Sequence, residues 1–144
     1  MLVIRLLMFC IISFFLVRKD IKEMILPDIY LIILFSCLLI FDIMFNREYI
    51  VFGGIGFLTA GVFFLTVYYM SGKKMGFGDV KYAAVLGYFL GIPAWVFAII
   101  LACIIAIIFF CFGIKIFNWN KTKKIPFGPF LAGGSIIVSL WSVL

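Results

Sequence analysis

Apolar stretches alternate with short polar breaks along the whole chain. They predict six helices, at residues 1–17, 28–45, 49–70, 80–91, 93–117 and 126–144. A helix needs about 20 apolar residues to cross a bilayer, so we expect the first and fourth to extend into their polar flanks. For the fourth helix, that extension would take in Asp79. We keep the fourth and fifth apart, rather than merging them, because Gly91-Ile92-Pro93 breaks a helix and the combined run is too long for one crossing.

Composition indicates a membrane protein. The chain has 144 residues, of which 67% are hydrophobic, and its mean hydropathy is +1.35. A soluble domain of this length cannot bury so much apolar surface. We therefore expect an all-α integral membrane protein, with residues 1–144 forming a single domain built as a six-transmembrane-helix bundle. The first stretch continues directly into Arg18-Lys19-Asp20 without a small-x-small cleavage site, which favours a retained helix over a signal peptide.

The basic residues are divided unevenly between the two ends of this predicted bundle. Two of the twelve, Arg5 and Arg47, fall at one end. The other ten fall at the opposite end: Arg18, Lys19, Lys22, Lys73, Lys74, Lys81, Lys115, Lys121, Lys123 and Lys124. Basic loops remain in the cytoplasm. This asymmetry predicts a multi-pass protein of the cytoplasmic (inner) membrane with both termini outside.

Six acidic residues limit the possible chemistry. Asp79 stands where a polar loop meets an apolar run, and a carboxylate entering a membrane helix is a candidate functional group because its burial is costly. Asp42 and Glu48 fall at the opposite end near Arg47, where we expect surface residues, possible partners of that arginine.

The other three acids share the predicted side of Asp79. Asp28 follows Pro27, which favours a helix cap, and Glu23 is expected in solvent. Asp20, at the inner end of the first helix, is either a partner of Asp79 or a surface acid neutralised by its basic neighbours, and the residues alone leave both open.

Two neighbouring carboxylates can hydrolyse a peptide without a metal or a covalent nucleophile. They cannot both ionise easily, so the pair retains one proton. The ionised member can take a proton from water, and the protonated member can donate a hydrogen bond to the attacked carbonyl. The chain contains no histidine, which excludes a Ser-His arrangement. Its four cysteines lie inside apolar runs and form no C-x-x-C pair, so they are interpreted as buried apolar residues.

Three motifs resemble those of a known family. Gly76-Phe77-Gly78-Asp79 is the G-x-G-D signature of intramembrane-type aspartyl proteases, and Met75–Lys81 is similar to the form found in type IV prepilin peptidases. Asp20, followed by Leu26-Pro27-Asp28, resembles the first acidic motif of that family. Residues 125–132, Ile-Pro-Phe-Gly-Pro-Phe-Leu-Ala, resemble its late I-P-F-G-P segment.

The resemblance implies a six-span bundle that removes the short basic leader from type IV prepilin-like precursors at the cytoplasmic face. Asp20 and Asp79 would form the catalytic dyad, without a cofactor or metal. The partners would be the lipid bilayer and a prepilin or pseudopilin precursor with an apolar N-terminal helix. Lys81 would tune the dyad or contact lipid phosphate. The other motif residues that would shape the site are Gly76, Gly78, Pro27, Asp28, Pro126, Gly128 and Pro129.

Small residues also form two seams at helical spacing. One is Asp79/Ala83/Gly87/Gly91 and the other is Ala98/Ala102/Ala106. Ordinary helix packing explains such seams. The alternative is that the apolar helix of the precursor enters the bundle beside them.

Many bacterial members of this family begin with a domain that bears two C-x-x-C pairs and is associated with N-methylation of the trimmed pilin. This chain shows no such pairs and resembles the short members, so we do not expect methyltransferase activity, S-adenosylmethionine or zinc. An archaeal preflagellin peptidase is an alternative within the same chemistry. A non-enzymatic membrane assembly partner or a small transporter is the alternative from another class.

Overall fold

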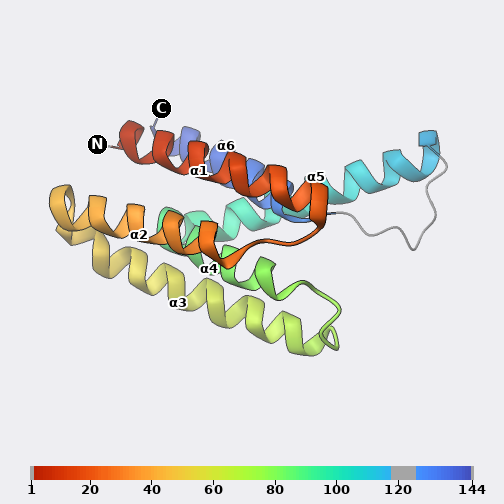
Figure 1. The fold of residues 1–144 in the computed structure, drawn as a ribbon, viewed down its shortest axis with the longest axis horizontal. Coiled ribbons are helices and arrows are strands. Elements are labelled where there is room, and N and C mark those ends of the chain that lie inside the picture. The colour runs from red at the N-terminus through yellow and green to blue at the C-terminus, as the bar shows by residue number, and fades with distance from the viewer. Residues whose placement is uncertain (1, 118–125, 144) are drawn as a thin grey trace.

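The computed structural model describes residues 2–117 and 126–143. Within these ranges the chain is all helical, as predicted, and contains no strand. Its six helices are α1 (Leu2–Glu23), α2 (Asp28–Phe45), α3 (Arg47–Met70), α4 (Phe77–Leu90), α5 (Ala94–Phe117) and α6 (Gly128–Val143). Successive helices run in opposite directions, so the start of α1 and the end of α6 lie at the same end of the bundle (Figure 1).

The helix boundaries confirm two expectations about the short segments. Helix α1 continues beyond its apolar run to Glu23 and so takes in Asp20. Helix α4 begins at Phe77 and takes in Asp79. The chain also breaks between α4 and α5, where Gly91 adopts a φ of 67°, a conformation that favours glycine.

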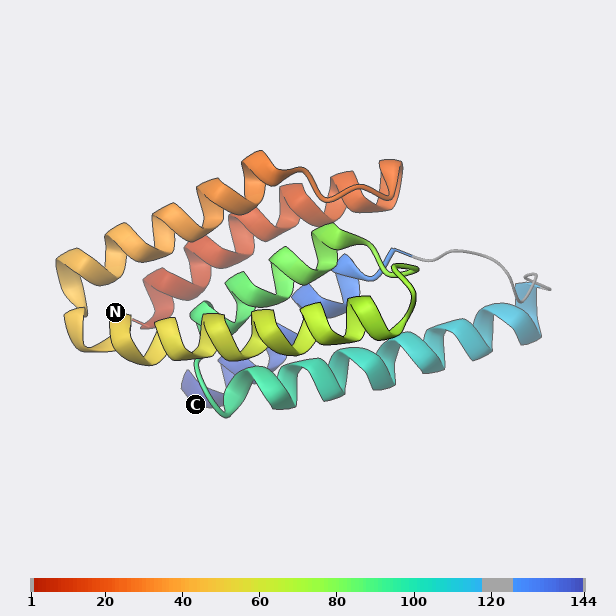
Figure 2. The same cartoon turned by 90° about the horizontal axis from the view of Figure 1, so that it is seen from below.

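Helix α4 is the central element of the bundle. From Tyr82 to Phe89 every residue is buried, and the ribbon of α4 runs between those of the other helices (Figure 2). Helix α3 packs most extensively against it, α5 packs against α6, and α1 packs against α2 and α6. A helix that is apolar all round is stable only when it is enclosed, so the short α4 is held by its neighbours.

Both small-residue seams are filled by helices of the same chain. A Cβ atom on Gly87 would overlap the Gly56 carbonyl oxygen of α3 and approach the Ala60 Cβ to 2.6 Å. A Cβ atom on Gly134 of α6 would overlap the Ala98 carbonyl oxygen of α5. Small residues permit this close contact between helix backbones. The packing interpretation is therefore confirmed for these contacts, and the entry of a precursor helix beside the seams stays a prediction.

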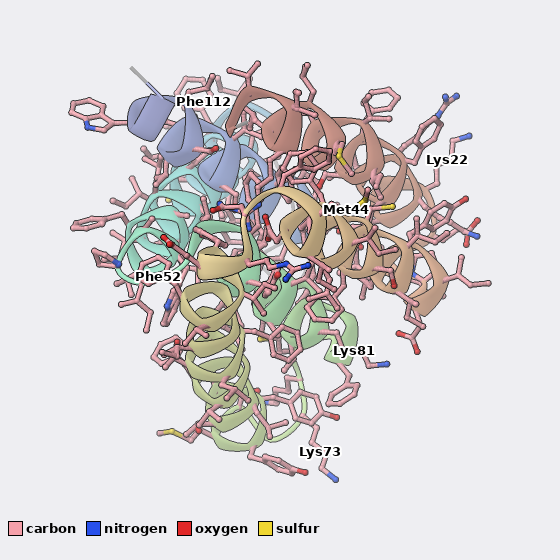
Figure 3. All side chains as sticks on the ribbon, turned by 90° about the vertical axis from the view of Figure 1, so that its left-hand side faces the viewer. Lys22, Met44, Phe52, Lys73, Lys81 and Phe112 are labelled. Atoms are coloured by element: carbon pink, nitrogen blue, oxygen red, sulfur yellow. The ribbon has the colours of Figure 1, made fainter. Side chains whose placement is uncertain are left out.

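Three helices in the described part of the chain are long and apolar enough to cross a bilayer, namely α2, α3 and the Ala94–Ile116 part of α5. Helices α4 and α6 have only 14 and 16 residues, and α1 carries several charges. Large apolar side chains such as Met44 and Phe112 are exposed on the outside of the bundle, while Lys22 and Lys73 extend from its periphery (Figure 3). These features are those of a membrane protein, and the crossing by all six helices stays a prediction.

Candidate active site

Asp20 and Asp79, which are far apart in the sequence, line the same two hollows. The larger hollow has a volume of about 610 Å³ and also involves Lys74 and Pro126. The smaller one, of about 230 Å³, is also lined by residues 24–26 and by the start of α4. The end of α1, the start of α4 and the start of α6 therefore meet around the two carboxyl groups.

The Asp20 carboxyl group is held by the backbone of α6. Its side chain belongs to a residue that is only 4% exposed, and Oδ2 accepts a hydrogen bond from the Gly128 backbone N–H at 3.0 Å. Burial raises the pKa of Asp20, and the Gly128 hydrogen bond acts in the opposite direction. Gly128 is the first residue of α6, whose N-terminus favours a nearby negative charge. Asp20 is thus the member of the pair that is better stabilised as an anion.

Among the described residues, no hydrogen-bond donor compensates the burial of Asp79 in this way. It lies half-buried in the first turn of α4 and outside the apolar run 80–91. Burial raises the pKa of Asp79 to about 7, and the negative charge of Asp20 contributes to this increase. Near neutral pH, Asp79 retains its proton more readily than Asp20, so the arrangement offers a proton donor beside a proton acceptor.

The motif glycines lie where an added Cβ atom would crowd the acids or the loop beside them. A Cβ atom on Gly78 would lie 2.8 Å from the Leu26 Cβ in the loop between α1 and α2. A Cβ atom on Gly128 would lie 2.5 Å from the Asp20 Oδ2, and one on Gly76 would lie 3.1 Å from the Asp79 Oδ2. Gly78 therefore permits a close approach of the G-x-G-D backbone to the loop between α1 and α2.

Asp28 does not cap α2. The N-cap is Pro27, and the structure shows no side-chain capping hydrogen bond there. Instead, both carboxylate oxygens of Asp28 lie 2.7 Å from the Lys81 Nζ. The cap expectation is therefore wrong, because the Asp28 carboxylate pairs with Lys81 of α4 and makes no capping hydrogen bond. Lys81 consequently points to Asp28 and does not line either hollow.

The late motif surrounds the larger hollow. Pro126 and Phe127 line it, and Gly128 contacts Asp20 directly. Pro129 lies in the first turn of α6. Three residues of this segment, Pro126, Phe127 and Gly128, therefore lie at the candidate site. Ile125 and the lysines at 121, 123 and 124 fall outside the described residues.

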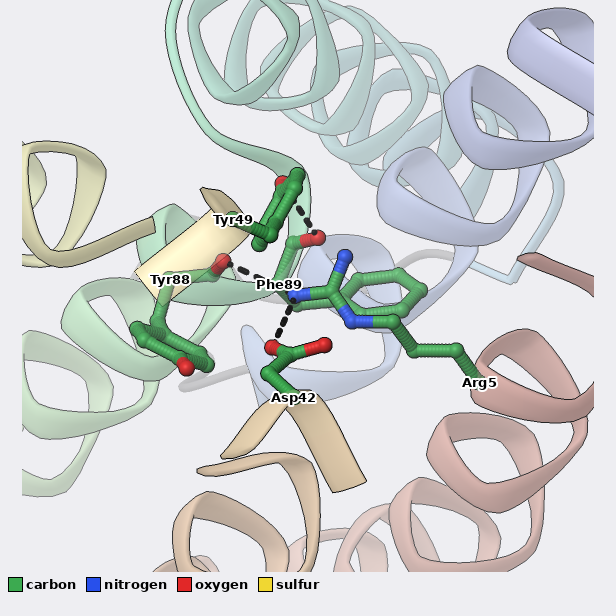
Figure 4. A network of polar contacts seen from close by, with 5 residues as sticks. All are labelled: Arg5, Asp42, Tyr49, Tyr88 and Phe89. Atoms are coloured by element: carbon green, nitrogen blue, oxygen red, sulfur yellow. Dashed lines mark hydrogen bonds and ion pairs between the residues drawn. The ribbon is translucent and has the colours of Figure 1, made fainter. Parts of the chain in front are cut away.

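At the opposite end of the bundle, Asp42 is fully buried and pairs with Arg5. The Arg5 Nη2 lies 3.1 Å from the Asp42 Oδ2 and also donates to the Tyr88 carbonyl oxygen at 3.3 Å (Figure 4). The expectation that Asp42 is a surface residue beside Arg47 is wrong. Arg47 instead donates to the Ile43 carbonyl oxygen. The missed signal was Arg5 itself, a charge inside an apolar stretch that requires a partner.

The sequence profile of the type IV leader peptidase family matches residues 7–111. The chain belongs to the type IV leader peptidase family. The matched residues include both Asp20 and Asp79 but not the late motif at residues 125–132.

Curated relatives agree with this assignment. A prepilin leader peptidase/N-methyltransferase of Aeromonas salmonicida (strain A449) is 33% identical over 129 residues, which cover 85% of this chain and 44% of the relative. Proteins of the same name from Aeromonas hydrophila and Pseudomonas aeruginosa are each 30% identical over 127 residues, with the same coverage of 85% and 44%. The chain thus spans less than half the length of these relatives. No solved structure matches it.

Proposed function

We propose that this protein is a membrane aspartyl endopeptidase that removes the basic leader from type IV prepilin-like precursors. One observation carries the proposal: Asp20 and Asp79 line shared hollows, and the pKa of Asp79 is raised to about 7 by burial and by the charge of Asp20. Family membership supports a peptidase. The proposal concerns peptide cleavage and does not extend to the N-methyltransferase activity that the names of the relatives also mention.

The two carboxyl groups would divide the work of hydrolysis. The Asp20 carboxylate takes a proton from a water molecule while the oxygen of that water forms a bond to the carbonyl carbon of the scissile peptide. Asp79 donates its proton to the carbonyl oxygen, which would otherwise develop a negative charge. The intermediate then collapses: its C–N bond breaks, the amine leaves with the proton from Asp20, and the hydroxyl proton returns to Asp79. Both residues regain their starting states.

The reaction would take place at the cytoplasmic face of the cell membrane. The end of the bundle that carries Asp20 and Asp79 also carries the described basic residues apart from Arg5 and Arg47. Basic residues remain in the cytoplasm. We propose a single six-span domain with both termini outside, in which the short α4 is enclosed by the other helices.

The apolar helix of the precursor would lie in a groove between α2, α3 and α4. This groove has a volume of about 530 Å³, and its lining is apolar apart from Asp28 and Lys81 at one end. Lys81 follows Asp79 by only two residues, so the groove begins at the same end of α4 as the candidate site. Because Asp28 and Lys81 neutralise each other, the groove suits an uncharged helix whose preceding residues reach the acids.

Coexpression with a candidate precursor, followed by mass measurement of the precursor's new N-terminus, tests the proposal. Asp20→Asn and Asp79→Asn should each abolish trimming while the protein still inserts. Glu23→Gln is the matched control, because Glu23 lies one turn beyond Asp20 on α1 and is exposed. Trimming at the wild-type rate by either aspartate variant would exclude this dyad. A transport defect without any proteolysis would favour the transporter alternative.

A further inference from the structure

The two helices that carry the candidate acids are joined by side chains across the interior. Helix α1 packs mainly against α2 and α6, while α4 packs mainly against α3. The distance between Asp20 and Asp79 therefore depends on the large side chains that fill the space between α1 and α4. One of these connections is polar and lies near the acids.

This connection is a hydrogen bond from Tyr82 of α4 to Ser13 of α1. The Tyr82 hydroxyl donates to the Ser13 Oγ at 3.2 Å, and the two residues are 0% and 1% exposed. Ser13 precedes Asp20 by seven residues, or two helical turns, and Tyr82 follows Asp79 by three. Residues at these spacings share one face of a helix. The bond therefore lies beneath the acids, on the faces that carry them.

The surroundings of this bond are apolar. Leu16, which separates Ser13 from Asp20 on the same face, is 0% exposed, and Ala83 beside Tyr82 is equally inaccessible. A buried hydroxyl without a partner is costly, and a buried hydrogen bond is strong in a medium of low dielectric constant. Tyr82 and Ser13 thus satisfy each other only in the arrangement of α1 and α4 in which their hydroxyls meet.

We propose that Tyr82 is a positioning residue for the peptidase reaction: its hydrogen bond to Ser13 holds α1 and α4 at the spacing that brings Asp20 and Asp79 together. This inference rests on the proposed function. Tyr82 itself touches neither hollow and takes no part in proton transfer. Its effect on the reaction is exerted through the position of the two carboxyl groups.

The charged groups around the two acids determine how the pKa of Asp79 would respond to a change in the distance between α1 and α4. Lys74, from the loop before α4, lines the larger hollow, whereas Lys81 is paired with Asp28 of α2. In the described part of α6, Gly128 offers only its backbone N–H to Asp20. The charge of Asp20 is the one that raises the pKa of Asp79, after burial. A wider spacing would weaken this effect and lower the pKa of Asp79.

The test compares Tyr82→Phe, Ser13→Ala and the double variant with the wild-type protein, using the full chain in membranes and a precursor that it cleaves. For each we measure kcat/KM against pH, normalised to folded protein. We expect each single variant to lose about tenfold in kcat/KM, and the basic limb of the profile to move to lower pH by about half a unit or more. The double variant should lose no more than a single variant, because both changes remove one bond.

Ser135→Ala is the matched control. Ser135 is 1% exposed, but its hydroxyl donates within α6 to the Leu131 carbonyl oxygen, so its loss should not move the pH profile. Wild-type rates and pH limbs in Tyr82→Phe and Ser13→Ala would overturn the inference while leaving the proposed function intact. A smaller amount of folded protein with an unchanged basic limb would also overturn the inference, because the Tyr82–Ser13 hydrogen bond would then contribute to stability alone. Absence of cleavage by the wild-type protein would instead contradict the proposed function.

Discussion

Arg5 and Asp42 form a buried ion pair at the end of the bundle opposite Asp20 and Asp79, with 3.1 Å between the Arg5 Nη2 and the Asp42 Oδ2. The Arg5 guanidinium also lies 3.8 Å from the centre of the Tyr49 ring, and Tyr49 in turn donates to the Phe89 carbonyl oxygen. Residues of α1, α2, α3 and α4 therefore meet at the Arg5 guanidinium. Removing one partner would leave the other buried and unpaired.

We expect Arg5→Met and Asp42→Leu each to lower the free energy of unfolding by about 3–5 kcal/mol, because a buried charge loses its partner. The double variant should recover most of this loss, since two apolar side chains then pack together. Thermal unfolding in detergent measures the effect. Equal losses that add in the double variant would contradict the pairing.

The protonation of Asp79 should make stability depend on pH. Its pKa is raised to about 7 in the folded protein by burial and by Asp20, whereas an unfolded aspartate has a pKa of about 3.9. Protonation of Asp79 therefore contributes fully to the stability of the folded state below pH 4, and this contribution is lost as the pH rises through 7. Asp79→Asn should not show this loss and should be more stable than the wild type by about 1–3 kcal/mol at pH 8.

Unfolding temperatures of Asp79→Asn and the wild type at pH 5 and pH 8 provide the measurement. The difference between the two proteins should be larger at pH 8. The same difference at both values would show that Asp79 is already ionised at pH 5.

Gly128→Ala should reduce cleavage while the protein remains folded. The new Cβ would lie 2.5 Å from the Asp20 Oδ2, so the carboxyl group, which is the free end of a side chain, must move away from its backbone donor. We expect a loss of about tenfold to a hundredfold in kcat/KM, because small displacements of a reacting group are costly. Gly133→Ala on the same helix is the control, since its Cβ would meet no atom within 4 Å. Equal activities of the two variants would exclude this role for Gly128.

Asp28 should be dispensable for the reaction, unlike Asp20. Its carboxylate is held by Lys81 and lines neither hollow that contains the acids. Because the pair is partly exposed, Asp28→Asn should change the free energy of unfolding by about 1 kcal/mol or less and lower cleavage by less than about tenfold. Complete loss of cleavage in this variant, with normal insertion, would assign Asp28 a direct role.

Filling the groove between α2, α3 and α4 should affect cleavage of a full-length precursor and of a short leader peptide differently. A Cβ on Gly61 would lie 3.4 Å from the Ala84 Cβ at the groove, so Gly61→Leu would place a side chain inside it. We expect strongly reduced cleavage of a full-length precursor, with little change for a short leader peptide without the apolar helix. Gly54→Leu on the same helix is the control, because a Cβ there meets no atom within 4 Å. Equal effects on both substrates would place the precursor helix elsewhere.

The order and ends of the helices followed from local chemistry. The alternation of apolar runs with charged and turn-forming residues predicted six helices and the break at Gly91-Ile92-Pro93. The alternating direction of the helices also followed, because each polar break allows only a short connection. On this basis Asp20 and Asp79 were assigned to one end of the bundle.

Tertiary structure decided which side chains meet across that bundle. The pairing of Asp28 with Lys81, the burial of Asp42 against Arg5 and the donation of the Gly128 N–H to Asp20 join residues that are 37 or more positions apart. Sequence spacing describes one face of one helix, whereas these contacts depend on how each helix is rotated against its neighbours. That rotation results from packing at positions such as Gly56 against Gly87, where the shape of two surfaces together, and not the composition of either, sets the fit.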